Sequence, residues 1–89
     1  MSRRDGGAAG IGDRVERVYV VLEGQESPRG AQAWFRRQLE ARRDLSMARS
    51  TVSRYCGGSK EAPPEVLEVL EDLEDEARAK LLTTLQSIG

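Results

Sequence analysis

The chain of 89 residues has no histidine and a single cysteine, Cys56. A zinc site of cysteine and histidine ligands and a disulfide within the chain are therefore excluded. Histidine is also the usual general base in catalysis, and the remaining carboxylates and serines show no pocket-like arrangement. We therefore expect a protein that is not an enzyme and that uses no cofactor, metal or small-molecule ligand. Cys56 is expected to be a buried small hydrophobic residue in a reducing compartment.

Aromatic residues and long apolar runs are also few. The aromatic residues are Tyr19, Trp34, Phe35 and Tyr55. Leucine, valine and alanine must therefore build most of the core, which favours packed helices over a sheet. No apolar run approaches the ~18 residues of a transmembrane helix, and no signal-peptide core follows Arg3 and Arg4. The composition predicts a soluble, cytoplasmic protein with one small domain and no membrane contact.

The net charge of −1 conceals a strong separation of charge along the chain. Residues 27–60 carry eight basic and two acidic side chains, a net charge of +6. Residues 61–89 carry eight carboxylates and two basic side chains, a net charge of −6, and residues 1–26 contribute −1. A basic middle beside an acidic tail indicates that one segment meets an anionic partner while the other faces water or protein.

The first part of the chain predicts an arm followed by a helix. Residues 1–11 contain three glycines and no apolar periodicity, so we expect a disordered arm. Beyond it, apolar residues recur at the spacing of one helix face, with Asp13 as the N-cap. They are Val15, Val18, Tyr19 and Leu22. Residues 18–22 also fit a short strand, and Gly24 would end either element.

The middle of the chain predicts two further helices. Ser27 followed by Pro28 is typical of a helix start, a serine cap before proline at the first helical position. The buried stripe of this helix is Ala31, Trp34, Phe35 and Leu39, and the helix is expected to end near Arg43. Ser46 is expected to cap the next helix, which ends at Gly57 and Gly58.

Pro63 and Pro64 then open a last helix of about 25 residues that has two apolar parts. The first part is wide enough to close the core of the domain, with Val66, Leu67, Val69, Leu70 and Leu73. The later part has no evident partner once that core is full, and it consists of Ala77, Leu81, Leu82, Leu85 and Ile88. We expect residues 74–89 to form a dimer contact, and the alternative is that they fold back on the helix over residues 15–22.

The segment over residues 45–58 carries the most specific pattern. It contains a leucine, a short turn with an apolar residue, a Ser/Thr/Arg-rich helix with one valine, and a glycine stop. This order resembles the second half of the helix-turn-helix unit in the phage repressor and Cro-like family. Leu45 matches the leucine, Met47 the apolar turn residue and Val52 the inward valine, with Tyr55 at the next buried position. The resemblance extends over about residues 31–73.

Two residues depart from the family pattern. Ser46 stands where the family prefers glycine, so the turn is either strained or longer. Arg42 stands where a small alanine is usual in the preceding helix. The spacing from Trp34 to Leu45 leaves open whether one long helix or two short ones precede the turn. The resemblance implies an all-α fold over residues 12–89, a small helix-turn-helix bundle of four to five helices with a long C-terminal helix.

The function that the resemblance implies is DNA binding, with the recognition helix over residues 49–56 in the major groove. Val52 and Tyr55 point inward at a spacing of three residues, which leaves the opposite face for the edges of the bases. The expected base-contacting residues are Arg49, Ser50, Ser53 and Arg54, because serine is short and arginine matches guanine. The expected contacts to the DNA backbone are Arg36, Arg37, Arg42, Arg43, Thr51 and Lys60.

We therefore predict a sequence-specific transcriptional regulator of phage or mobile-element type that binds double-stranded DNA, with Arg3 and Arg4 as a further contact of the arm. A homodimer through the C-terminal helix would place two recognition helices about 34 Å apart on a palindromic site. Two alternatives stay open. One is a protein-interaction module that binds RNA polymerase or another regulator, and the other is a small terminase or recombination accessory subunit.

Overall fold

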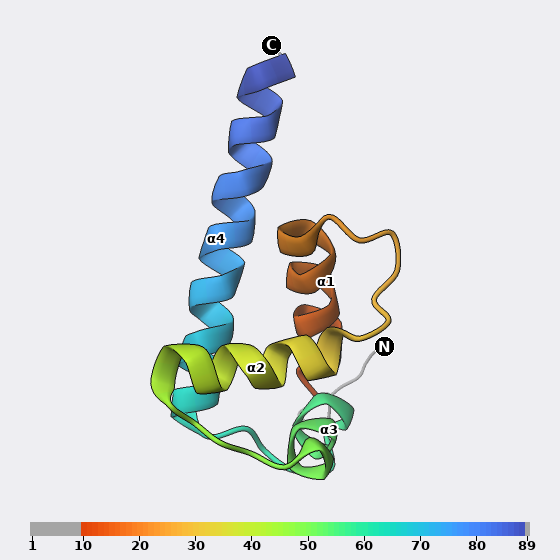
Figure 1. The fold of residues 1–89 in the computed structure, drawn as a ribbon, viewed down its shortest axis with the longest axis vertical. Helices are drawn as coiled ribbons and strands as arrows, with labels where there is room; N and C mark the ends of the chain where they lie inside the picture. Colours follow the sequence, from red (N-terminus) through yellow and green to blue (C-terminus); the bar gives the residue numbers. More distant parts are fainter. Residues whose placement is uncertain (1–9, 89) are drawn as a thin grey trace, which may run out of the picture.

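The computed structural model describes residues 10–88, and these form four α-helices and no strand. The helices are α1 (Gly12–Glu23), α2 (Ala31–Arg43), α3 (Arg49–Gly57) and α4 (Pro64–Ile88). α1 lies beside the long α4, α2 crosses α4 near its beginning, and α3 lies at the end of the molecule away from the C-terminus (Figure 1). This arrangement confirms the predicted class, a small all-helical bundle with a long C-terminal helix. None of the four helices is long and apolar enough to cross a membrane.

The core lies where α1, α2, α3 and the first half of α4 meet. Its largest fully buried side chains are Phe35, Leu39, Leu70, Leu73, Val15, Val52, Val66 and Val69. Trp34 is also buried, and its indole N–H donates to the carboxylate of Glu23 at 3.0 Å. The ring of Tyr19 packs against the indole, with 5.4 Å between the two centroids. Trp34 and Phe35 are therefore core residues, as the apolar stripe predicts.

The predicted arm over residues 1–11, with its two arginines, lies outside the described residues except for its last two positions. Ile11 is buried against the end of α3, and its N–H donates to the carbonyl oxygen of Tyr55 at 3.1 Å. A Cβ atom at Gly10 would lie 2.1 Å from the carbonyl oxygen of Cys56, so only glycine permits this close approach. Gly10 and Ile11 therefore belong to the folded domain.

α1 is a helix and not the short strand that residues 18–22 also fitted. It begins at Gly12, and the N-cap position is occupied by Ile11, which offers no capping oxygen. The prediction that Asp13 caps the helix is therefore wrong. Asp13 lies instead in the first turn, where its charge favours the positive end of the helix dipole. Gly24 ends α1 as predicted, with a left-handed φ of 64°.

α2 begins three residues later than the pair Ser27 and Pro28 predicts. The residue before Ala31 is Gly30, whose φ of 88° is incompatible with a helix, so the helix does not extend back to Pro28. The hydroxyl of Ser27 accepts the N–H of Arg29 at 3.2 Å, so it stabilises a local turn and does not cap α2. A single helix of 13 residues therefore precedes the turn.

The connection from α2 to α3 spans residues 44–48. Asp44 takes the left-handed conformation with a φ of 56°, which aspartate tolerates better than most residues, and its N–H donates to the carbonyl of Glu40. Ser46 has no positive φ, so the turn is not strained there but is longer than the usual three to four residues. The N-cap of α3 is Ala48, without a side-chain hydrogen bond. The prediction that Ser46 caps the helix is therefore wrong.

α4 begins at Pro64 as predicted, and its first half closes the core. Ala77 is also buried, because α1 packs alongside α4 as far as this turn. The expectation that Ala77 has no partner within the chain is therefore wrong. Beyond it, Lys80 Nζ donates to the carbonyl of Leu22 at 3.0 Å, close to the end of α1. Leu81 and Leu82 are the first residues of α4 that leave large apolar side chains exposed.

Candidate nucleic-acid interface

α3 presents two different faces, one to the core and one to solvent. Val52 and Tyr55 are buried, three residues apart on the inner face, and Cys56 lies beside them. Burial raises the pKa of the Cys56 thiol, which keeps it neutral and suits its role as a small apolar residue. Val52 and Tyr55 lie about one helix turn apart, so the burial of both fixes the orientation of α3. The opposite face of α3 therefore points toward solvent.

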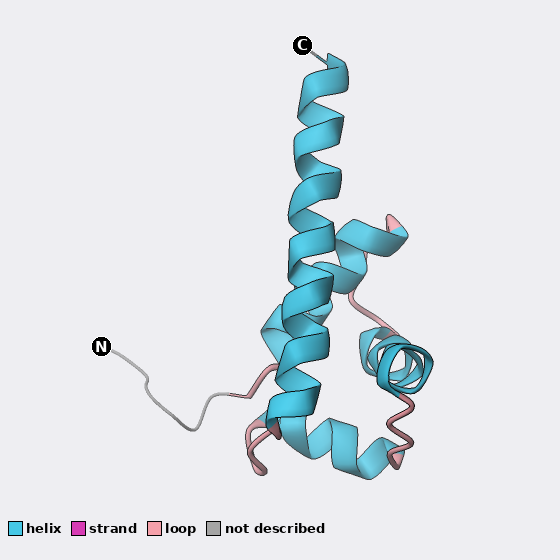
Figure 2. Ribbon diagram, turned by 90° about the vertical axis from the view of Figure 1, so that its left-hand side faces the viewer, coloured by secondary structure: helices cyan, strands magenta, loops and turns pink. Residues whose placement is uncertain are grey.

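The four residues predicted to contact bases all lie on this outer face. Arg49, Ser50, Ser53 and Arg54 are each exposed. Thr51 is half-buried between the two faces, as expected for a contact at the side of the helix. α3 runs across α2 and does not lie alongside it. Figure 1 shows α3 nearly end-on, whereas Figure 2, turned by 90°, shows α2 end-on. The outer face of α3 is therefore not covered by α2.

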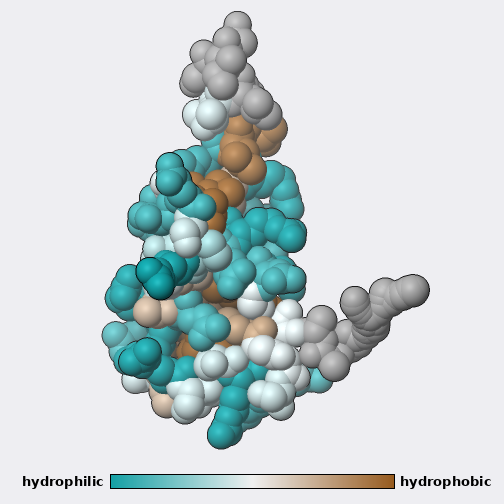
Figure 3. All heavy atoms as spheres, turned by 90° about the vertical axis from the view of Figure 1, so that its right-hand side faces the viewer, coloured by the Kyte–Doolittle hydropathy of each residue, from teal (hydrophilic) through white to brown (hydrophobic). Residues whose placement is uncertain are grey.

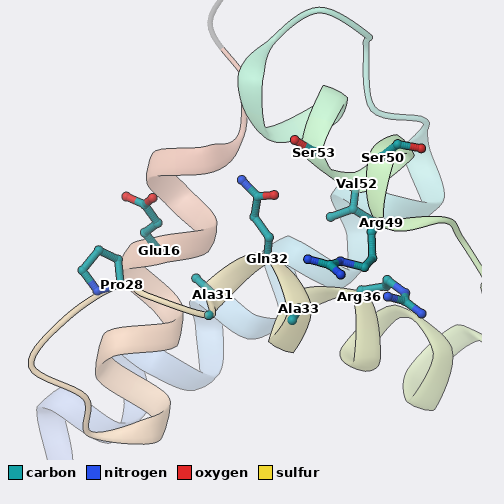
Figure 4. Close-up of a pocket in the computed structure, with 11 residues that line it drawn as sticks. Glu16, Pro28, Ala31, Gln32, Ala33, Arg36, Arg49, Ser50, Val52 and Ser53 are labelled. Atoms are coloured by element: carbon teal, nitrogen blue, oxygen red, sulfur yellow. The ribbon is translucent and has the colours of Figure 1, made fainter.

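A hollow separates α3 from the first turns of α2. Its lining comprises Glu16, Pro28, Gly30, Ala31, Gln32, Ala33, Arg36, Arg49, Ser50, Val52 and Ser53. Figure 4 shows the side chain of Gln32 rising from α2 into this space, with Glu16 on one side and Arg49 on the other. Glycine and alanine at positions 30, 31 and 33 keep the hollow open because they add little volume. The hollow thus joins α1, α2 and α3 in one surface.

Gln32 and Glu16 are polar residues of this surface that the sequence pattern does not identify. Both lie off the apolar stripes of their helices and are exposed, which the sequence does indicate. Only the crossing of the helices places them beside Ser53 and not on a remote face. A glutamine amide pairs with adenine, and a carboxylate accepts from the amino group of cytosine, so both side chains suit contacts to base edges.

The basic residues predicted to contact the DNA backbone fall into two groups. Arg37 and Lys60 are exposed, and Arg36 is half-buried. Within residues 10–88, no carboxylate pairs with these three residues or with Arg49 and Arg54. The ammonium of Lys60 also lies over the ring of Tyr55, 5.9 Å from its centroid. Arg36 therefore lies across the hollow from Arg49, Arg37 lies near the turn before α3, and Lys60 lies near the C-terminal end of α3.

Arg42 and Arg43 form the second group, and both face α4. Two guanidinium nitrogens of Arg42 donate to the carboxylate of Glu76, one of them at 2.8 Å, and this contact lowers the pKa of Glu76. Arg43 Nη2 lies 2.8 Å from Glu68 Oε1. The structure thus gives these two arginines a partner within the chain at the end of α2 away from the hollow. Arginine at position 42 thus has a structural role, since its long side chain reaches α4.

Acidic groups limit the surface on two sides. Asp13 and Glu16 of α1 lie near Ser53 and the C-terminal end of α3. The carboxylates of α4 are partly neutralised by arginines of α1 and α2, including a bidentate pair of Arg14 with Glu74 at 2.7 and 2.8 Å. Positive side chains therefore lie where α2 meets α3, at Arg36 and Arg49, and negative side chains lie on the α1 side.

The described residues contain no group of three or more histidine, cysteine, aspartate or glutamate side chains arranged to hold a metal ion. No protein-family model matches the chain, and neither a curated protein nor a solved structure matches it significantly.

Proposed function

We propose that this protein is a sequence-specific DNA-binding regulator of transcription, a repressor or related control protein of phage or mobile-element type that acts in the cytoplasm. The observation that carries the proposal is the division of α3 into a buried face and an exposed face. Val52 and Tyr55 hold the helix in the core, while two arginines and two serines occupy the face that is open to solvent.

The dimensions and chemistry of α3 suit the major groove. An α-helix with its side chains is about 10–12 Å across, and the major groove is about 12 Å wide and accepts one helix. Ser50 and Ser53 are short and allow close approach to the bases. Arg49 and Arg54 offer the forked guanidinium that pairs with O6 and N7 of guanine. The outer face of α3 can therefore come close to the bases and also offers donors that match a specific base.

Backbone contacts in this proposal come from the cations beside α3. Arg36, Arg37 and Lys60 neutralise phosphate groups, which adds affinity without sequence preference. Arg42 and Arg43 contribute less than the sequence predicts, because carboxylates of α4 already pair with them. Thr51 remains a contact to a phosphate or sugar at the side of the helix.

Selection from a pool of random duplex DNA tests the proposal. We expect an enriched site, and Arg54→Ala should then lower affinity for that site by about 1–3 kcal/mol and relax the preference for one base. Arg37→Ala should weaken binding to all sequences alike and reduce the dependence on salt. Thr83→Ala is the control, because Thr83 is exposed near the end of α4 and its change removes no charge from the α3 surface.

A selection without an enriched site would contradict the regulator proposal. A stoichiometric complex with RNA polymerase in the absence of DNA would favour the interaction module in its place. A ring-shaped oligomer would favour the accessory subunit of a terminase or recombination assembly.

A further inference from the structure

The hollow between α2 and α3 offers different hydrogen-bonding groups at its two ends. Arg36 and Arg49 lie at one end, and a guanidinium only donates. Glu16 lies at the other end, where its carboxylate only accepts, and Gln32 rises between the two ends (Figure 4). A ligand that is complementary to this hollow therefore presents acceptors at one end and a donor at the other.

Glu16, Gln32 and Ser53 come together from three different helices. The same three residues also line a second hollow, between the start of α1 and the end of α3. α1 is held at this place because Ile11, just before its first turn, is buried and donates its N–H to the carbonyl oxygen of Tyr55 in α3. The packing of helices, and not a flexible loop, therefore places the backbone of Glu16 near Ser53.

The surface around this hollow suits a polar ligand. Figure 3 shows mostly hydrophilic and intermediate colours at the end of the molecule that carries α3, whereas hydrophobic atoms gather toward the C-terminal end of α4. Within the proposed function, the polar ligand is the major-groove edge of DNA. There guanine presents two acceptors, and cytosine presents one amino donor. A guanine near Arg49 and a cytosine near Glu16 therefore match the hollow.

We propose that Glu16 is a specificity-determining residue that accepts a hydrogen bond from the amino group of one cytosine in the DNA site. The inference rests on the proposed function and adds a residue of α1 to the base contacts of α3. Arg49 and Ser53 lie one turn apart on the same side of α3, about 6 Å along its axis, which is about two base-pair steps. Because Glu16 and Ser53 line the same two hollows, this cytosine lies within about two base pairs of the base that Arg49 contacts.

The other three bases suit a carboxylate less well at this position. Guanine and thymine present acceptors, O6 and O4, where cytosine presents its amino group, and these acceptors repel a carboxylate. Adenine has an amino group but also the acceptor N7 beside it. A glutamine in place of Glu16 would satisfy both groups of adenine, because its amide donates as well as accepts. Glu16→Gln should therefore move the preference at this position from cytosine to adenine.

Selection from random duplex DNA with the full wild-type chain and with Glu16→Gln tests the assignment. The wild-type motif should contain this cytosine, and duplexes with cytosine or adenine at this position should differ in affinity by at least about fivefold. Glu16→Gln should abolish or reverse that difference and leave the rest of the motif unchanged. Glu26→Gln is the matched control, because it removes the same charge from the loop after α1, outside both hollows. Circular dichroism should show the same helix content in all three proteins.

Three results would overturn the assignment. The same motif from the wild type and from Glu16→Gln would refute the base contact of Glu16 and leave the proposed function standing. A uniform gain in affinity of Glu16→Gln for all sequences would also refute it, since Glu16 would then only repel phosphate. A wild-type selection without any motif would refute the proposed function, and the assignment with it.

Discussion

The close approach of Gly10 to α3 gives a sharp prediction for stability. A Cβ atom at this position would lie 2.1 Å from the carbonyl oxygen of Cys56 and 2.4 Å from the amide nitrogen of Gly58. Both neighbours are backbone atoms of the end of α3, so neither can rotate away as a flexible side chain would. Gly10→Ala therefore forces either a shift of backbone or the release of the segment that contains Ile11.

The costs of these two responses determine how much Gly10→Ala lowers the free energy of unfolding. Release of the segment would expose Ile11, which costs about 1.5–3 kcal/mol, and would break its hydrogen bond to Tyr55, which costs about 0.5–1.5 kcal/mol. A shift of the backbone around an oversized group costs about 1–3 kcal/mol. The chain takes the cheaper response, so we expect a loss of about 1–3 kcal/mol. For a domain of this size, this loss lowers Tm by about 5–20 °C.

Urea unfolding followed by circular dichroism measures the effect. Gly57→Ala is the control, because a Cβ atom there would meet nothing within 4 Å and alanine is the better helix former. That change should raise the free energy of unfolding by up to about 1 kcal/mol. A Gly10→Ala protein within about 0.5 kcal/mol of wild type, which is the scatter of neutral surface changes, would refute the packing of residue 10 on α3.

Three further changes test the surface and the ion pairs. If the amide of Gln32 contacts a base, Gln32→Ala should weaken binding to the selected site by about 1–3 kcal/mol in a titration and change binding to random DNA little. An equal loss of affinity for both DNAs would contradict a base contact. Arg36→Ala should weaken binding to all sequences and lower the salt slope by about one, whereas a change in base preference would contradict a phosphate contact. Arg14 lowers the pKa of Glu74, so the pair stabilises the fold above about pH 4.3 and is lost as the pH falls through the lowered pKa. Glu74→Gln should therefore cost under about 1 kcal/mol near pH 7, and this cost should shrink as the pH falls through the lowered pKa of Glu74. A cost that does not change with pH would contradict the ion pair.

The sequence predicts the helices well wherever apolar spacing decides them. The stripe of α2 through Trp34 and Leu39 and the first half of α4 are buried as expected, because a spacing of three and four residues leaves one orientation that buries them all. Gly24 and Gly58 end their helices for a local reason, the left-handed conformation, that needs no tertiary information.

Helix starts were less predictable, since three capping predictions were wrong. Asp13, Ser27 and Ser46 each have the right side chain for a cap, but each helix begins at another position. Because Ile11 is buried against α3, α1 begins at Gly12, before the start that a cap at Asp13 predicts. Gly30 delays α2, and the extended turn places Ala48 at the cap of α3. A capping bond is worth about 1 kcal/mol, which packing of a core residue exceeds.

The candidate site was predicted in part. The exposed face of α3 follows from the inward positions of Val52 and Tyr55, so its four polar residues could be named from spacing alone. The partners of Arg42 and Arg43 could not, because they come from α4, more than 20 residues along the chain. The neighbourhood of Gln32 likewise depends on how α2 crosses α3, which periodicity does not specify.

Recognition of a specific DNA sequence by the outer face of α3 can be measured directly. The most direct measurement is selection from random duplex DNA with the wild-type chain, repeated with Arg49→Ala and Arg54→Ala. We expect one enriched motif for the wild type and an altered or relaxed base preference for each variant. A wild-type selection without a motif, or the same motif from all three proteins, would contradict it.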